Sequence, residues 1–212
     1  MTNLQILKGN RYELGPRERH VFTFEHVSVW EFGDNFFFFD VSNPDQEETS
    51  LYGEYAPSLS LGKIFGRDLS FGAIKDLRLT AGFEFGKGYR TFLYGAGVDL
   101  ALPRFTFFKA KLCARDTADV EGVTWQATLI WLAPLHFRSA KFLFGGFADF
   151  AGREGQRASN QLTAPQFLLD VGSFWGRPGS FFAGIEYQYW RNKFGVRGVT
   201  ENAAQAMVRF NL

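Results

Sequence analysis

Residues 108–115 read Phe-Lys-Ala-Lys-Leu-Cys-Ala-Arg, and this stretch decides the fold class. Apolar residues stand at its even-numbered positions, while two lysines, a cysteine and an arginine stand at its odd-numbered positions. Successive side chains of a β-strand point to opposite faces, so a period of two predicts a strand with one apolar and one charged face. The same alternation recurs in 122–133, 180–191 and 203–212, and less regularly in 20–32.

About twelve such runs follow one another along the chain. Most are about 10–13 residues long, which is near the length that a tilted strand needs to cross a bilayer. No helix longer than a turn or two is required. The sequence therefore predicts an all-β fold, a transmembrane antiparallel up-and-down β-barrel of about 12 strands, formed by a single domain over residues 1–212. The runs lie near 3–8 and at 20–32, 35–42, 49–61, 76–86, 89–101, 104–116, 122–133, 140–151, 161–172, 180–191 and 203–212.

Composition excludes several classes of protein. The 212 residues include 26 Phe, and aromatic residues make up 18% of the chain, which is too much apolar surface for intrinsic disorder. No stretch approaches the roughly 18 apolar residues of a membrane-spanning helix. With 23 basic and 22 acidic residues the net charge is +1, so no nucleic-acid partner is expected. The first residues, Met-Thr-Asn-Leu-Gln, do not form a signal peptide, and we expect the chain to be the mature form.

The connections between the predicted strands differ in length. Tight turns are expected at 86–88 and 103–104, and longer polar loops at 43–49, 62–75, 151–160 and 192–202. Short turns at one rim and long loops at the other are typical of outer-membrane barrels, and we expect that arrangement here.

Two features favour a barrel whose apolar face is turned to lipid. The apolar faces of twelve strands exceed what the interior of a soluble barrel accommodates. Aromatic residues on the apolar face are expected toward strand ends, where they match an interfacial girdle. A soluble carrier barrel with an apolar interior is the alternative that periodicity leaves open. The predicted girdle residues are Tyr55, Trp125, Trp131, Tyr187 and Tyr189.

Signals of catalysis are weak. None of the three histidines stands at the helical or hairpin spacing of a metal pair, and Cys113 is the one cysteine. Ser60-Leu-Gly-Lys63 fits a nucleophile pattern that is common by chance, and it lacks the companion motifs. The glycines at 95 and 97 are expected to allow close strand approach and not to bind phosphate. The sequence therefore predicts no enzyme, no catalytic residue, no metal and no cofactor.

The segment 33–40, Gly-Asp-Asn-Phe-Phe-Phe-Phe-Asp, carries the sharpest functional signal. Alternation puts Phe37 and Phe39 on the lipid face and leaves Phe36 and Phe38 on the same side as the two aspartates. Rings beside carboxylates inside a channel would suit a flat polar ligand such as a nucleoside, whose base stacks on a π-face. Packing of these rings against a neighbouring inward segment is the simpler alternative.

From residue 24 the chain reads Phe-Glu-His-x-x-x-Trp-x-x-Gly-Asp-Asn. This pattern resembles the nucleoside-specific outer-membrane channel family of Tsx-like or OmpK-like porins. Further similarity to the family follows in the same order at 51–61, 141–149, 165–172, 184–195 and 205–209. The resemblance implies a twelve-stranded monomeric barrel in the outer membrane of a Gram-negative bacterium. It also implies passive diffusion of nucleosides through the barrel, without enzyme activity. The final residue, Leu212, departs from the aromatic residue that usually ends such barrels.

On these grounds we expect a lumen that binds nucleosides weakly, because transport requires release, with nucleosides and the lipid bilayer as partners. The alternative within the same fold is a receptor or adhesion barrel with a plugged lumen that acts through its long loops. In the predicted lumen, Phe36 and Phe38 would stack on the base, with Tyr52 and Trp190 as further rings. Hydrogen bonds to sugar and base edges would come from Glu25, Asp40, Glu54, Lys109, Arg115, Asp149, Asp170, Glu186 and Arg209.

Overall fold

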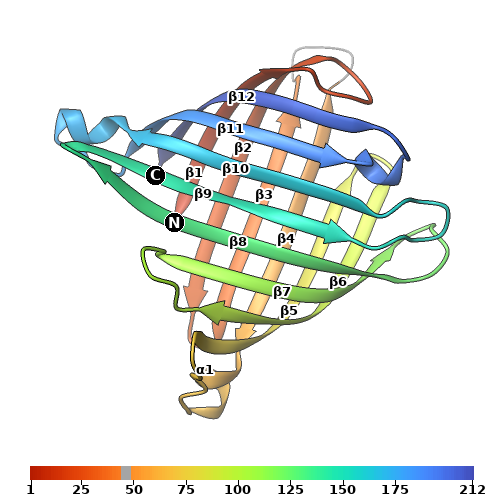
Figure 1. Cartoon of the computed structure of the whole chain (residues 1–212), viewed down its shortest axis with the longest axis horizontal. Helices are drawn as coiled ribbons and strands as arrows, with labels where there is room; N and C mark the ends of the chain where they lie inside the picture. Colours follow the sequence, from red (N-terminus) through yellow and green to blue (C-terminus); the bar gives the residue numbers. More distant parts are fainter. Residues whose placement is uncertain (44–48) are drawn as a thin grey trace.

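The computed structural model describes residues 1–43 and 49–212, and these form one closed antiparallel barrel of twelve strands (Figure 1). Each strand pairs with its neighbours in sequence, and β1 pairs with β12 to close the barrel. The predicted all-β barrel is confirmed. The strands are β1 (Thr2–Asn10), β2 (Glu18–Trp30), β3 (Gly33–Ser42), β4 (Ser50–Ser60), β5 (Ile74–Gly86), β6 (Tyr89–Leu100), β7 (Phe107–Thr117), β8 (Thr124–Phe137), β9 (Ala140–Ala151), β10 (Asn160–Asp170), β11 (Phe181–Arg191) and β12 (Thr200–Asn211).

Both chain ends lie at one rim, called here the termini rim, where the Leu212 amide donates to the Thr2 carbonyl at 2.9 Å. The opposite rim, called the loop rim, holds the connections that follow β1, β3, β5, β7, β9 and β11. We expected short connections at one rim and long connections at the other, and two connections contradict this expectation. The long connection 61–73 lies at the termini rim, and the tight turn 87–88 lies at the loop rim. Residues 44–48 of the predicted loop 43–49 lie outside the described residues.

The long connection at the termini rim contains a helical turn, α1 (Leu61–Phe65). The Ser60 hydroxyl accepts from the Lys63 amide and caps this turn, and Gly66 ends it in the left-handed conformation. Ser60 and Lys63 thus have a structural role here. Two short 3₁₀ helices, η1 (Val171–Trp175) and η2 (Lys193–Gly195), lie in other connections. Within the described part of the chain, no helix has the length and apolar character that a membrane span requires.

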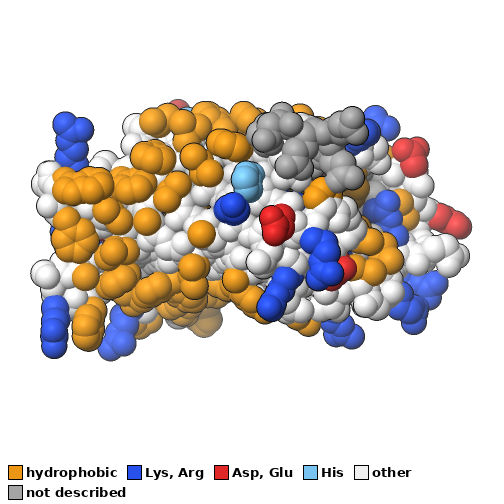
Figure 2. All heavy atoms as spheres, turned by 90° about the horizontal axis from the view of Figure 1, so that it is seen from above, with side chains coloured by type: hydrophobic (Ala, Val, Ile, Leu, Met, Phe, Trp, Pro, Cys, Tyr) orange, Lys and Arg blue, Asp and Glu red, His pale blue; other side chains and the backbone are white. Residues whose placement is uncertain are grey.

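The barrel is apolar outside and largely polar inside. In β7, Leu112 faces outward with 61% exposure, whereas the neighbouring inward residue Cys113 is 8% exposed. Figure 2 shows apolar side chains over the part of the barrel nearer the termini rim, with charged side chains more frequent toward the loop rim. This distribution is opposite to that of a soluble carrier with an apolar interior, so that alternative is wrong.

The predicted aromatic girdle is only partly where the sequence placed it. Trp125 and Tyr189 lie near the loop-rim ends of β8 and β11. Tyr55, Trp131 and Tyr187 lie near the middle of their strands, where they belong to the apolar belt and not to its edge. Alternation identifies the face on which a ring lies, but it does not show the depth at which the bilayer boundary cuts the strand.

Close strand approach explains both predicted glycines. A Cβ atom on Gly95 would lie 2.1 Å from the Leu112 carbonyl oxygen on β7, and a Cβ atom on Gly97 would lie 2.8 Å from the Ala110 carbonyl oxygen, so neither position has room for a side chain. Inside the barrel, a small apolar cluster packs the wall formed by β1, β2 and β9–β12. It consists of Leu7, Val21, Leu168, Phe182 and Met207, with Leu143 against it. The lumen is therefore polar along most of its wall and apolar along one part.

Candidate functional site in the barrel lumen

The strand register turns every predicted lumen residue inward. Asn3 and Gln5 of β1 are buried, and Asn3 lies opposite Glu25, so the face that carries these residues is the interior. Residues paired in the register lie on the same face of the sheet, so the pairing of each strand with the next identifies the inward residues around the whole barrel. The predicted residues on it are Glu25, Phe36, Phe38, Asp40, Tyr52, Glu54, Lys109, Arg115, Asp149, Asp170, Glu186, Trp190 and Arg209.

Four aromatic rings form a row along the inner wall. The Phe36 and Phe38 ring centroids are 5.6 Å apart, and Phe38 lies 5.9 Å from Tyr52 on the next strand. Tyr52 in turn lies 6.4 Å from Tyr89, the first residue of β6. We call Phe36, Phe38, Tyr52 and Tyr89 the aromatic row. It extends from the interior of β3 to the loop rim, so a solute moving along the lumen passes successive π-faces.

Carboxylates beside this row accept hydrogen bonds from neutral groups. The Tyr52 hydroxyl donates to Glu54 at 2.6 Å, and the Thr23 hydroxyl donates to Asp40 at 2.5 Å. Elsewhere on the wall, Asp149 accepts from Thr128, Glu186 accepts from Gln166 and Gln205, and Glu25 accepts from Asn3. These groups are partly exposed and present oxygen atoms to which hydroxyl groups of a ligand could donate.

A bidentate ion pair stands near the loop-rim end of the row. Two Arg115 nitrogens donate to the two Glu84 oxygens, each at 2.9 Å, and the Arg115 guanidinium also contacts Tyr89 and Gln126. The two side chains are only 12% and 8% exposed. Arg115 was predicted as a site residue and its partner Glu84 was not, because strand alternation shows the face of a residue and not its cross-strand partner.

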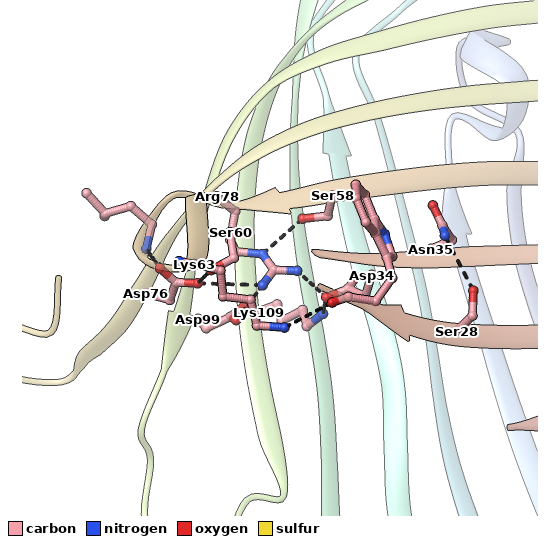
Figure 3. Close-up of polar contacts among 12 residues, drawn as sticks. Ser28, Asp34, Asn35, Ser58, Ser60, Lys63, Asp76, Arg78, Asp99 and Lys109 are labelled. Carbon is pink, nitrogen blue, oxygen red and sulfur yellow. Dashed lines mark hydrogen bonds and ion pairs between the residues drawn. The ribbon is translucent and has the colours of Figure 1, made fainter. Parts of the chain in front are cut away.

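A second charged cluster lies in the lumen toward the termini rim (Figure 3). At its centre the buried Arg78 pairs with Asp34, and it lies 3.4 Å from Asp99 and 3.6 Å from Asp76. Lys109 on β7 reaches Asp34 on β3 at 3.0 Å. The cluster thus links β3 to β7 across the intervening strands. Asp76 and Asp99 were not among the predicted site residues, although Asp76 alternates regularly with Leu77 and Arg78 and lies opposite Asp99 in the register.

Asp170 has a different role from the one predicted for it. Its carboxylate accepts from the Ser173 amide at 3.1 Å and from the Gly179 amide at 3.0 Å. It therefore caps η1 and holds the β10–β11 connection at the termini rim, although the register still turns it inward.

Loops fold over the loop-rim mouth and border a small pocket that is partly open to solvent. The Ala158 amide donates to the Gly195 carbonyl at 2.9 Å, which joins the β9–β10 loop to the β11–β12 loop. The Thr117 amide donates to Glu154 at 2.8 Å and holds the first of these loops against β7. The residues that line this mouth pocket are Tyr89, Arg115, Gly152, Glu154, Arg157, Ala158, Asn160, Trp190 and Phe194.

The mouth pocket combines predicted and unpredicted residues. Arg115 and Trp190 were predicted, and the Trp190 ring lies 4.4 Å from that of Phe194. Arg157 lies over the Tyr89 ring at 6.0 Å. The loop residues were missed because loops have no periodicity that indicates which side chains turn inward.

A buried pair anchors the same mouth. Lys193 donates to Glu201 at 2.5 Å, and Glu201 also accepts from the Glu13 amide of the β1–β2 loop at 2.6 Å. Burial lowers the pKa of Lys193, while the hydrogen bond to Glu201 opposes that shift. Burial raises the pKa of Tyr12, whose hydroxyl donates to Gln205 beside this pair. One carboxylate thus holds two loops at the mouth.

Among the described residues, no group of three or more His, Cys, Asp or Glu side chains is arranged to hold a metal ion. A closed antiparallel barrel with an apolar exterior and a charged interior defines a transmembrane barrel of the outer-membrane class. Residues 7–211 match the family described as "Nucleoside-specific channel-forming protein, Tsx". The chain belongs to this family, and it is a protein of the bacterial outer membrane.

A curated relative is similar in sequence. The outer membrane protein OmpK of Vibrio parahaemolyticus is 24% identical over 169 residues, which cover 74% of this chain. The chain spans 62% of the length of that relative.

Solved porins share the fold. The NanC porin superposes with a TM-score of 0.63 at 11% identity, covering 99% of this chain and 100% of that one. The KdgM porin in complex with disordered oligogalacturonate gives 0.57 at 5% identity and covers 99% of both chains. At these identities the likeness shows the fold alone.

Proposed function

We propose that this protein is an outer-membrane channel through which nucleosides diffuse passively, with weak binding in the lumen. The observation that carries the proposal is the aromatic row with hydrogen-bonding carboxylates beside it. A nucleoside has a flat base and a sugar with hydroxyl groups. The row offers successive rings for the base, at about 1–3 kcal/mol per stacked base, and Glu54 and Asp40 offer acceptors for the sugar.

The mouth pocket supports a route for nucleosides from the loop rim along the aromatic row. Its Tyr89 is the last ring of the aromatic row, and Trp190 and Phe194 add two more rings on the facing strand and loop. A base that enters at this mouth would meet these rings before it reaches Tyr52. Family membership supports the same ligand class, since the family is described as nucleoside-specific.

The closed barrel also supports a channel formed by one chain. Because β1 pairs with β12 over Asn3–Gly9 and Gln205–Asn211, the barrel that the described residues form is closed by one chain and has no open sheet edge for another subunit to complete. The proposed unit of transport is the monomer.

Single-channel recording in planar bilayers tests this function. We expect ionic current through the reconstituted protein and brief, concentration-dependent interruptions when adenosine or thymidine is added. Ribose, which has the sugar but no base, is the matched control and should leave the current unchanged. Current that neither nucleoside interrupts would contradict nucleoside binding. A folded protein that carries no current would contradict the channel and favour the receptor alternative with a plugged lumen.

A further inference from the structure

Aromatic side chains are exposed on the connections of the termini rim. Phe71 of the β4–β5 connection is 82% exposed, and Trp175 at the end of η1 is 68% exposed. Phe65 and Phe174 of the same two connections are exposed as well. An aromatic ring in water gives up the free energy that burial in an apolar environment would provide. These connections therefore present apolar surface that the rest of the described chain leaves uncovered.

One of these rings continues the lipid face of the barrel. The Trp175 ring lies 5.9 Å from that of Phe181 at an interplanar angle of 6°, and Phe181 stacks on Phe210 at 4.6 Å between ring centroids. Phe181 and Phe210 alternate with the inward residues of their strands, so both point outward. Trp175 therefore lies at the edge of the apolar belt, where aromatic rings of membrane proteins meet the lipid headgroups.

Basic side chains accompany these rings. The connections 61–73, 101–106, 138–139 and 171–180 each carry one or two of them, and all are exposed. Among the described residues, none of these basic side chains has a carboxylate within 4 Å. We call these five residues the basic band: Lys63, Arg67, Arg104, Arg138 and Arg177.

Each cation of the basic band lies close in the chain to an aromatic ring. Arg138 follows Phe137, and its guanidinium lies over that ring at 5.6 Å. Arg177 comes two residues after Trp175 in the same connection. Figure 2 shows lysine and arginine side chains at this end of the barrel, beyond the apolar side chains. Long basic side chains at such positions cover apolar surface with their stems while their charged ends reach the headgroup level.

Few acidic side chains oppose the basic band. The connections of the termini rim carry five basic residues and two acidic ones, Glu31 and Asp68, whereas those of the loop rim carry seven of each. Asp76 and Asp170 also lie near the termini rim, but each accepts a hydrogen bond from a backbone amide of the adjoining connection. The excess of positive charge is therefore a property of one rim and not of the whole chain.

We propose that the basic band binds the headgroups of anionic phospholipids in the leaflet at the termini rim. Such a lipid satisfies both parts of the surface, because its phosphate pairs with a basic side chain while its acyl chains cover the neighbouring rings. A free phosphate ion would leave the rings exposed to water. An excess of positive charge also favours anionic lipids over zwitterionic ones. Because this surface lies outside the barrel, the assignment holds whether or not nucleosides pass through the lumen.

Quenching of tryptophan fluorescence by brominated lipids measures which lipid lies beside the basic band. The protein is reconstituted in phosphatidylcholine vesicles that contain either brominated phosphatidylglycerol or brominated phosphatidylcholine at matched mole fractions. The contribution of Trp175 is the difference between the wild-type protein and Trp175→Phe. One adjacent cation favours an anionic lipid by about fivefold, so brominated phosphatidylglycerol should half-quench Trp175 at a roughly fivefold lower mole fraction.

A second tryptophan provides a control within the same molecule. Trp125 alternates with the inward Gln126 near the loop-rim end of β8, so it faces outward at the rim whose charges balance. Its contribution, obtained from Trp125→Phe, should be the same with either brominated lipid. Its quenching also shows in each variant that the barrel is folded and inserted.

Two arginine variants test the cation itself. Arg177→Gln removes the cation nearest in the chain to Trp175 and should lower the preference by about fivefold. The hydrogen bonds of Arg177 are made by its backbone, so the substitution leaves the connection intact. Arg197→Gln removes an exposed arginine of the loop rim and is the matched control, which should leave the preference at Trp175 unchanged.

Equal quenching of Trp175 by the two lipids would overturn the proposal, as would a preference that Arg177→Gln does not lower. An equal preference at Trp125 would overturn it too, because the lipid would then be attracted by the whole protein. Loss of the preference when inorganic phosphate replaces chloride at constant ionic strength would show that the basic band binds the free anion and not the lipid.

Discussion

The Glu84–Arg115 pair is the strongest polar contact of the lumen wall near the aromatic row, and Arg115→Met tests what it contributes. Methionine retains much of the length of the arginine side chain but has no charge and no donor. The substitution leaves Glu84 with its Tyr89 hydrogen bond alone, at 2.7 Å, and it removes two contacts of 2.9 Å. Glu54 lies directly opposite Glu84 in the register of β4 and β5, so a like charge remains beside the unpaired carboxylate.

The geometry gives the expected magnitude. Hydrogen bonds that involve charged groups contribute about 1.5–3 kcal/mol each, so the loss of two predicts a destabilisation of about 3–6 kcal/mol. This agrees with the roughly 3–5 kcal/mol that removal of one partner of a buried ion pair typically costs. The side chains are 12% and 8% exposed, so little solvent screening reduces these values.

Denaturant unfolding in lipid vesicles, followed by tryptophan fluorescence, measures the free energy of unfolding. The double variant Glu84→Gln/Arg115→Met removes the unpaired charge and should recover a large part of the loss, with a coupling energy of about 0.5–3 kcal/mol. An unfolding free energy of Arg115→Met within about 0.5 kcal/mol of the wild-type value would contradict a stabilising role for the ion pair. A double variant that is no more stable than the single one would contradict it as well.

Three further predictions concern the aromatic row, the lipid face and the mouth. Phe38→Ala should weaken nucleoside block by about 5- to 150-fold, the equivalent of one lost stacking contact, and Phe37→Ala on the outward face should leave block unchanged; equal effects of both would show that the ring acts through packing. Leu112→Arg, in the middle of the outward face of β7, should cost about 2–4 kcal/mol in unfolding free energy, while Lys111→Arg next to it on the inward face should be nearly neutral; a tolerated Leu112→Arg would contradict the assigned lipid face. Glu201→Gln should release the β1–β2 and β11–β12 loops and speed tryptic cleavage there, and an unchanged cleavage rate would show that the loops do not depend on this carboxylate.

Alternation was sufficient to predict the strands and the faces of their residues. In β7 the polar and apolar sets are cleanly separated, so the sequence places Lys109 and Arg115 inside and Leu112 outside, as the structure does. The four consecutive phenylalanines of β3 are divided correctly for the same reason. A period of two needs only local information, and each strand of a barrel has one interior face.

Contacts between distant segments could not be predicted in this way. The mouth pocket brings Tyr89 next to Arg157 and Trp190 next to Phe194, across loops that carry no periodic signal. Asp170 reads as an inward charge, yet its carboxylate is occupied by backbone amides of the β10–β11 connection. Such roles depend on the path of a connection in space, which the alternation of its flanking strands does not determine.

The position of a bound nucleoside distinguishes binding along the aromatic row from binding elsewhere in the barrel. A crystal structure of the protein soaked with adenosine should show the base against the aromatic row, in contact with Phe38 or Tyr52, and the ribose hydroxyl groups within hydrogen-bond distance of Glu54 or Asp40. A base bound elsewhere, with the row left empty at a saturating concentration of adenosine, would contradict the account.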